Sequence, residues 1–319
     1  MDLLKLLNDK ADYFSSEDDR GVSRVVSHIQ IAEKHYENGK SGEDYLFNDV
    51  IYRSNQAFEG VLKEAYRIIK GKNPDKVTPY AIENYFEKNK VLKERVLKLF
   101  TNYRTEWRNK STHDYTLYFT EQEAFLAIVN ISAFINILLD QMIQKRAYDN
   151  ELLELKESPV IENDELKNKP LIERVKDLLI SYSKEINKKT SGSVLPTLNE
   201  SEIIGSLTAY IISVAKDISV KTEYSFLGSR YRADFYLESG NEKLIIEIKS
   251  SKFDITNSLN AGTEQLINYL AISKTKQGII YIPPLVQHDE ELKVEKLKRS
   301  VGGNSYEIIQ IFPINRYSN

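Results

Sequence analysis

Two short apolar runs separated by Gly240-Asn241 predict a β-hairpin in the C-terminal third of the chain. The runs, 233–237 and 243–248, are rich in apolar and β-branched residues, and glycine at the first central position suits a two-residue type II′ turn. That turn fixes the register of the two strands. It pairs Ser239 with Glu242 next to the turn and, farther along, Asp234 with Glu247.

The predicted register sets two acidic side chains directly opposite each other. The Cβ atoms of Asp234 and Glu247 would lie about 5 Å apart. Side chains alternate along a strand, so Lys249 shares the face of Glu247, whereas the core-facing positions are Leu244, Ile246 and Ile248. Opposed carboxylates repel unless a cation lies between them, and their oxygens suit Mg²⁺ or Mn²⁺. The alternative interpretation is a solvated hairpin face with ordinary charged residues.

The stretch from Asp234 to Lys249 resembles the PD-(D/E)xK superfamily of nucleases. The resemblance implies an α/β domain with a mixed sheet, in which Asp234, Glu247 and the main-chain carbonyl of Ile248 bind the metal ion. Such an ion can lower the pKa of a bound water and stabilise charge on a phosphate. Lys249 would hold that water or neutralise the developing negative charge.

Two flanking helical segments extend the resemblance. Gln265 and Tyr269 are four residues apart and hence lie on one helical face. A Q-x3-Y helix after E-x-K is similar to the exonuclease-like and Mrr-like branches, which implies that Gln265 helps to hold substrate or metal-bound water; an ordinary surface helix is the alternative. Upstream, Asn199 and Glu202 fit an N-cap with a capping box. Glu200 is therefore the expected additional carboxylate beside the metal, with Glu202 as the alternative.

The first half of the chain carries helical patterns and almost no strand signals. A long helix is expected from the capping box Thr120–Glu123 to about Met142. It is apolar on more than one side, which predicts burial at the centre of a bundle or in a subunit interface. The preceding helices are expected at 49–69, 80–88 and 90–108.

A short polar segment between the last two of these helices contains Arg108, Asn109 and His113. Arginine suits phosphate binding, and histidine can transfer a proton near neutral pH. On one regular helix Arg108 and His113 would point apart by about 140°, whereas in an interhelical loop they can converge. The segment resembles the R-x4–6-H motif of the HEPN family of helical domains. The resemblance implies a homodimer with a composite RNA-cleaving site that Glu59 and Lys63 also line. The alternative is that Arg108 caps a helix end and His113 is an exposed loop residue.

A chain of 319 residues suggests two domains. We expect an α+β multidomain protein with a HEPN-like helical bundle at 1–150 and a PD-(D/E)xK restriction-endonuclease-like α/β domain at 170–319. The polar segment 151–169 fits a linker, or an exposed helix over part of its length, and Pro170 can begin the next helix. That helix is expected to reach about Lys184, and 184–192 is expected to be a basic loop.

Composition limits the setting in which the protein works. The chain has no cysteine, which excludes disulfides and cysteine-ligated metals and fits a reducing cytoplasm. Its apolar stretches are expected to fall short of a membrane span, and its N-terminus begins no signal peptide. The net charge of −3 means that nucleic acid must be bound by local basic patches. The candidates are Lys184 with Lys188 and Lys189, Lys249 with Lys252, and Lys274 with Lys276, and a solvated face is the favoured interpretation of any single cluster.

These features predict a metal-dependent nuclease that hydrolyses phosphodiesters with the help of Mg²⁺ or Mn²⁺. The resemblances imply DNA as the favoured substrate, although RNA stays open, and a role in phage defence. One alternative is a metal-independent ribonuclease that uses Arg108 and His113, with the C-terminal domain binding the target. A second alternative is a non-catalytic nucleic-acid-binding dimer, against which the complete set of Asp234, Glu247 and Lys249 argues.

Overall fold

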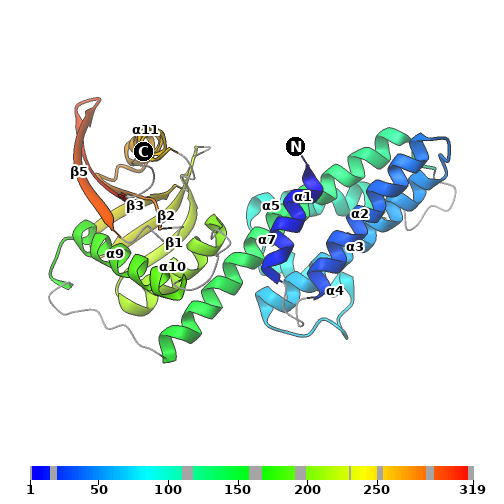
Figure 1. Cartoon of the computed structure of the whole chain (residues 1–319), viewed down its shortest axis with the longest axis horizontal. Helices are drawn as coiled ribbons and strands as arrows, with labels where there is room; N and C mark the ends of the chain where they lie inside the picture. The colour runs from blue at the N-terminus through cyan, green and yellow to red at the C-terminus, as the bar shows by residue number, and fades with distance from the viewer. Residues whose placement is uncertain are drawn as a thin grey trace. The chain divides into compact units, whose positions relative to one another are not determined.

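The computed structural model describes residues 2–14, 20–109, 118–157, 167–190, 199–229, 231–249, 254–284 and 291–314. The chain divides into two compact units, Met1–Arg146 and Ala147–Asn319. Every regular element described in the first unit is helical, and the second unit holds a six-stranded mixed sheet with helices on it (Figure 1). The α+β class expected from the sequence is therefore confirmed.

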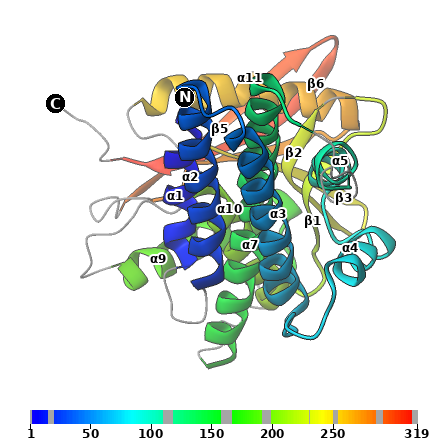
Figure 2. The same ribbon diagram turned by 90° about the vertical axis from the view of Figure 1, so that its right-hand side faces the viewer.

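The first unit is a helical bundle with an aromatic centre. Its α2 and α3 lie side by side along much of their length (Figure 2). Phe58 of α3 meets Phe100 of α5 and Phe134 of α7, with ring centroids 5.6 Å away in both cases. The elements are α1 (Leu3–Ala11), a 3₁₀ turn η1 (Asp12–Phe14), α2 (Arg20–Lys40), α3 (Leu46–Lys70), α4 (Pro79–Lys88), α5 (Glu94–Tyr103), a π-helical turn η3 (Arg104–Arg108) and α7 (Glu121–Glu157).

The ends of these helices follow local sequence signals. Gly71 ends α3 in the left-handed conformation, with φ of 68°, and its N–H bonds the carbonyl of Arg67. The capping box that opens α7 is confirmed, because Glu123 Oε2 accepts from the Thr120 N–H at 2.9 Å and Thr120 Oγ1 accepts from the Glu123 N–H at 3.3 Å.

The long helix α7 differs from expectation in two respects. It continues past Met142 to Glu157, so the polar segment from Lys145 is helical at least that far. The continuation has tertiary support, because Glu151 is buried and Leu155 packs against the core of the second unit. The expectation that every apolar stretch is too short for a membrane span was also wrong: by length and composition α7 qualifies. Of its most apolar window, 56% is buried, which fits the core helix of a soluble protein.

In the second unit, helices cover both faces of the sheet (Figure 1). The strand order is β1-β2-β3-β4-β6-β5, in which β4 runs parallel to both β3 and β6 and the other neighbours are antiparallel. The elements are α9 (Leu171–Thr190), α10 (Glu200–Val214), β1 (Ser219–Ser225), β2 (Arg232–Ser239), β3 (Glu242–Ile248), α11 (Ile255–Ser273), β4 (Gln277–Tyr281), β5 (Leu292–Val301) and β6 (Asn304–Pro313). Helix α9 begins after Pro170 as expected, but it extends to Thr190 rather than ending near Lys184.

The hairpin of β2 and β3 has the predicted register. Ser239 pairs with Glu242, and the ladder continues to Phe235 and Ile246. Gly240 has φ of 57°, as the first central residue of a type II′ turn requires. On one face of β3, Leu244, Ile246 and Ile248 pack with α9 and α10. The opposite face, which the sequence suggested was the charged one, is covered by α11 and buries Ile245.

Candidate metal centre

The ladder between β2 and β3 ends one position before Asp234 and Glu247. Beyond the last ladder pair, the Ile248 N–H bonds a side chain of β2 instead of its main chain: Asp234 Oδ2 accepts this hydrogen bond at 2.7 Å. This bond holds the carboxylate against the end of β3. The structure thus brings Asp234, Glu247 and Ile248 together where the hairpin register placed them.

Glu247 is a buried carboxylate, and one of its two oxygens is satisfied. Only 3% of the residue is exposed. Its Oε1 accepts from Lys249 Nζ at 2.8 Å, whereas Oε2 is buried without a hydrogen-bond partner among the described residues. Buried carboxylate oxygens normally have partners, so an orphaned one marks a position for a ligand or ion.

The surroundings disfavour negative charge on both acids. Burial, reinforced by the nearby Glu247, raises the pKa of Asp234 to about 7. Burial also raises the pKa of Glu247, although Lys249 opposes the increase. A cation beside these two acids would favour their ionised forms and could contact the orphaned oxygen.

Helix α11 supplies the residues that hold Lys249 in place. Lys249 Nζ donates to Gln265 Oε1 at 2.7 Å, and Gln265 Nε2 in turn donates to the Tyr269 hydroxyl. The predicted pair Gln265 and Tyr269 therefore points into the site rather than to solvent. Gly262, one turn earlier, was not singled out from the sequence. A Cβ there would lie 3.4 Å from Lys249 Cγ and Cε, at van der Waals contact, so the lysine stem runs along this turn of the helix.

At the start of α10, Glu200 and Glu202 lie in different surroundings. Asn199 caps the helix by accepting from the Glu202 N–H at 2.8 Å, and the Glu202 carboxylate bonds back to the Asn199 main chain. Burial raises the pKa of Glu202 to about 7. Glu200 is exposed, and its negative charge contributes to the raised pKa of both Asp234 and Glu247. Glu200 therefore acts electrostatically on both acids, and its role beside a metal ion stays a prediction.

The donor set fits Mg²⁺ or Mn²⁺ with an incomplete protein shell. Among the residues described, no group of three or more His, Cys, Asp or Glu side chains is placed to hold a metal ion together. Asp234, Glu247 and the Ile248 carbonyl would supply part of the coordination, and water or substrate the rest. Magnesium commonly retains several waters and binds through one or two carboxylates, which matches this arrangement.

In the helical unit, Arg108 lies in a helical turn rather than in a loop. It closes the π-helical turn η3, its Nη2 lies 3.5 Å from Glu59 Oε1, and its Nη1 donates to Asn109 Oδ1 at 3.2 Å. The contact agrees with the expectation that Glu59 lines the same cleft. His113 lies outside the described residues, so its convergence with Arg108 stays a prediction.

Next to this arginine is a buried acid that sequence reasoning missed. Glu83 of α4 is 3% exposed, and its Oε2 lies 3.9 Å from Arg104 Nη1. Burial raises its pKa, while Arg108 and Arg104 act in the opposite direction. Nothing in the local pattern of α4 marked this glutamate, because its role depends on the facing helix.

No protein-family model, no curated protein and no solved structure matches the chain. The chemistry of the carboxylate centre must therefore be inferred from its own geometry.

Proposed function

We propose that the protein is a metal-dependent nuclease that hydrolyses phosphodiester bonds at the Asp234–Glu247 centre, with DNA as the favoured substrate. The observation that carries the proposal is the orphaned Glu247 Oε2, buried beside a second carboxylate of raised pKa and 2 residues from a lysine whose ammonium bonds the other oxygen. A stable fold avoids such a pair unless a cation completes it.

The residues of the centre have separable roles. Asp234, Glu247 and the Ile248 carbonyl would hold Mg²⁺ or Mn²⁺, which when bound supplies a water of lowered pKa and charge neutralisation. Lys249 carries the positive charge suited to stabilising an oxyanion at phosphorus. Gln265 positions that ammonium through its 2.7 Å contact. Glu200 adds an exposed carboxylate able to bind an ion through water.

The order of elements supports the same proposal. The elements follow the order α10-β1-β2-β3-α11-β4, the strands belong to one mixed sheet, and the acids lie near the start of β2 and the end of β3. This arrangement agrees with the resemblance to PD-(D/E)xK nucleases. It is also the basis on which we propose phage defence as the biological role and nucleic acid as the partner.

The proposal is tested by cleavage of DNA and of RNA with Mg²⁺ and with EDTA. We expect Mg²⁺-dependent cleavage that falls at least about a hundredfold in Asp234→Asn and in Lys249→Met. Glu238→Gln is the matched control, because Glu238 lies on the same strand but pairs with Lys221 at 2.8 Å. Wild-type rates in both centre variants would refute the proposal.

A second candidate is a metal-independent ribonuclease in the helical unit, favoured by the contact of Arg108 with Glu59 and by the π-helical turn that carries the arginine. It requires a homodimer with paired motifs. We expect, on this candidate, RNA cleavage that resists EDTA and is lost in Arg108→Ala and His113→Ala. Sedimentation analysis of the wild-type protein tests the dimer. Binding without cleavage by any variant would favour a non-catalytic protein.

A further inference from the structure

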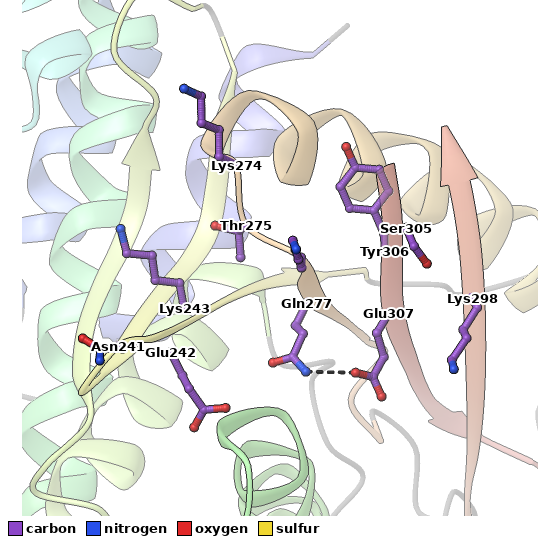
Figure 3. Close-up of a pocket in the computed structure, with 11 residues that line it drawn as sticks. Asn241, Glu242, Lys243, Lys274, Thr275, Gln277, Lys298, Ser305, Tyr306 and Glu307 are labelled. Carbon is purple, nitrogen blue, oxygen red and sulfur yellow. Dashed lines mark hydrogen bonds between the residues drawn. The ribbon is translucent and has the colours of Figure 1, made fainter. Parts of the chain in front are cut away.

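A cavity of about 510 Å³ opens at the end of the sheet opposite the carboxylate centre (Figure 3). It lies between the β2–β3 turn, the connection from α11 to β4, and the β5–β6 hairpin. Lys243 in its wall precedes Glu247 by four residues on β3, which corresponds to about 13 Å along the strand. The volume is within the range of small-ligand sites. The cavity is therefore separate from the proposed metal site.

The wall of this cavity contains a buried hydroxyl group that has no partner. Thr275 is 3% exposed, and its Oγ1 makes no hydrogen bond within the described part of the chain. The threonine main chain is satisfied, since its N–H bonds the carbonyl of Leu270 at 3.1 Å. A buried hydroxyl without a partner needs an explanation, and a ligand in the adjoining cavity provides one.

Four lysines line the same cavity: Lys243, Lys274, Lys276 and Lys298. Lys243 and Lys274 lie on the side of the cavity where Thr275 lies, whereas the carboxyl groups of Glu242 and Glu307 point to the opposite side (Figure 3). In the described structure no carboxylate lies within 4.0 Å of the amines of Lys274 and Lys276. The wall thus combines a hydroxyl and two lysines, Lys274 and Lys276, for which the described residues supply no partner, whereas Lys243 Nζ lies 3.9 Å from Glu238 Oε1.

Neither the end of α11 nor the two glutamates of the cavity wall account for Lys274 and Lys276. The last carbonyls of α11 are capped by main-chain N–H groups, from Lys274 to Ala271 and from Thr275 to Leu270, so the helix end does not need the lysine side chains. The two glutamates bind elsewhere. Glu242 Oε2 accepts from the Leu171 N–H at 3.1 Å, and Glu307 Oε2 accepts from Gln277 Nε2 at 2.9 Å.

We propose that this cavity binds a phosphate group, with the Thr275 hydroxyl donating to a phosphate oxygen and Lys243, Lys274 and Lys276 neutralising its charge. Lysine acts on phosphate as a point charge, and a hydroxyl adds a directed hydrogen bond. The phosphate belongs either to a nucleotide or to the backbone of a nucleic acid strand. The site does not rest on nuclease activity at the carboxylate centre.

The test uses the full chain in EDTA, so that metal-dependent cleavage does not interfere. Isothermal titration with inorganic phosphate and with a 5′-mononucleotide, and fluorescence anisotropy with a short single-stranded oligonucleotide, give the affinities. We compare Thr275→Val and Lys276→Gln with the wild type. Lys293→Gln is the control, because Lys293 pairs with Glu295 at 2.7 Å on β5 and does not line the cavity.

We expect both cavity variants to bind at least about tenfold more weakly than the wild type, and Lys293→Gln to bind like the wild type. Thr275→Val is close in shape to the wild type and removes an orphaned hydroxyl, so its melting temperature should not fall. Binding of the mononucleotide would identify a nucleotide site. Binding of the oligonucleotide alone, with a salt slope reduced by about one in Lys276→Gln, would identify the nucleic acid backbone.

Two outcomes would overturn the proposal: no binding of any of the three probes, or equal affinity in the wild type and both cavity variants. The variant Asp234→Asn distinguishes a failure of the phosphate site from a failure of the proposed nuclease. That variant should bind the probes as the wild type does. A protein that binds phosphate through Thr275 yet cleaves nothing would refute the nuclease proposal and leave this site intact.

Discussion

Asp234 is an acid in surroundings that disfavour its ionised form. Its pKa is raised from 3.8 to about 7, by burial first and by Glu247 second. Between these two pH values the folded protein binds more protons than the unfolded chain, so the free energy of unfolding falls as the pH rises. The contribution of Asp234 to the stability of the metal-free protein should therefore be largest below this window and fall as the pH approaches 7.

We expect Asp234→Asn to stabilise the metal-free protein at pH 8 by about 1–3 kcal/mol, because asparagine can still accept from the Ile248 N–H without adding charge beside Glu247. Urea unfolding in EDTA at pH 8 and pH 5 measures the effect, which should shrink at the lower pH. Glu238→Gln serves as control on the same strand. A variant less stable than the wild type at pH 8 would show that the ionised Asp234 carboxylate does not destabilise the fold.

Gln265 acts on Lys249 and not on the acids, which gives it a distinct kinetic signature. In Gln265→Ala the ammonium keeps its bond to Glu247 but loses the 2.7 Å contact that directs it. On the proposed mechanism we expect kcat to fall about tenfold to a hundredfold with KM nearly unchanged, and Tyr269→Phe to have a smaller effect. Steady-state cleavage kinetics measure both constants. An increase in KM alone would instead make Gln265 a substrate-binding residue.

At the scale of elements, the β2–β3 turn determines where the acids meet. Gly240 adopts φ of 57°, and the first central position of a type II′ turn favours glycine over every residue with a Cβ. We expect both Gly240→Ala and Gly240→Asn to lower the free energy of unfolding by about 1–2 kcal/mol, because neither residue readily adopts this conformation. Urea denaturation of the two variants is the measurement. Equal stability of all three proteins would argue against the turn type.

The register of this hairpin could be read from the sequence because two adjacent residues specify it. The capping boxes at Thr120 and Asn199 were readable for the same reason, since each depends on a span of four residues. Strands β1 and β5 were not predicted. Strand β1 is short and polar, and β5 is an edge strand made largely of charged residues, so neither has the apolar run that marks a buried strand.

Features that depend on tertiary contacts escaped the sequence analysis. Gly262 matters because Lys249 approaches it from another element, and Glu83 matters because two arginines on the facing helix surround it. The orphaned hydroxyl of Thr275 follows from the packing of three strands and a helix end. None of these residues stands in a motif, so only the folded arrangement identifies them.

At the scale of the whole molecule, each unit has its own hydrophobic core. The centre that we assign to metal binding lies wholly in the second unit, and Phe58, which is fully buried, lies in the core of the first. A ligand that binds one unit should stabilise that unit alone. Calorimetry should therefore show two unfolding transitions, one that responds to ligands and substitutions in the first unit and one that responds to those in the second.

We expect Mg²⁺ at about one hundred times its dissociation constant to stabilise the second unit by about 2.7 kcal/mol. For a unit of this size that corresponds to an increase of about 5–10 °C in its melting temperature. Asp234→Asn should abolish the increase while leaving the other transition in place. Phe58→Ala should lower the transition that Mg²⁺ does not shift, because it removes a buried ring from the first core. If Mg²⁺ shifted both transitions equally, or shifted the one that Phe58→Ala lowers, the assignment of the metal site to the carboxylates of the second unit would be wrong.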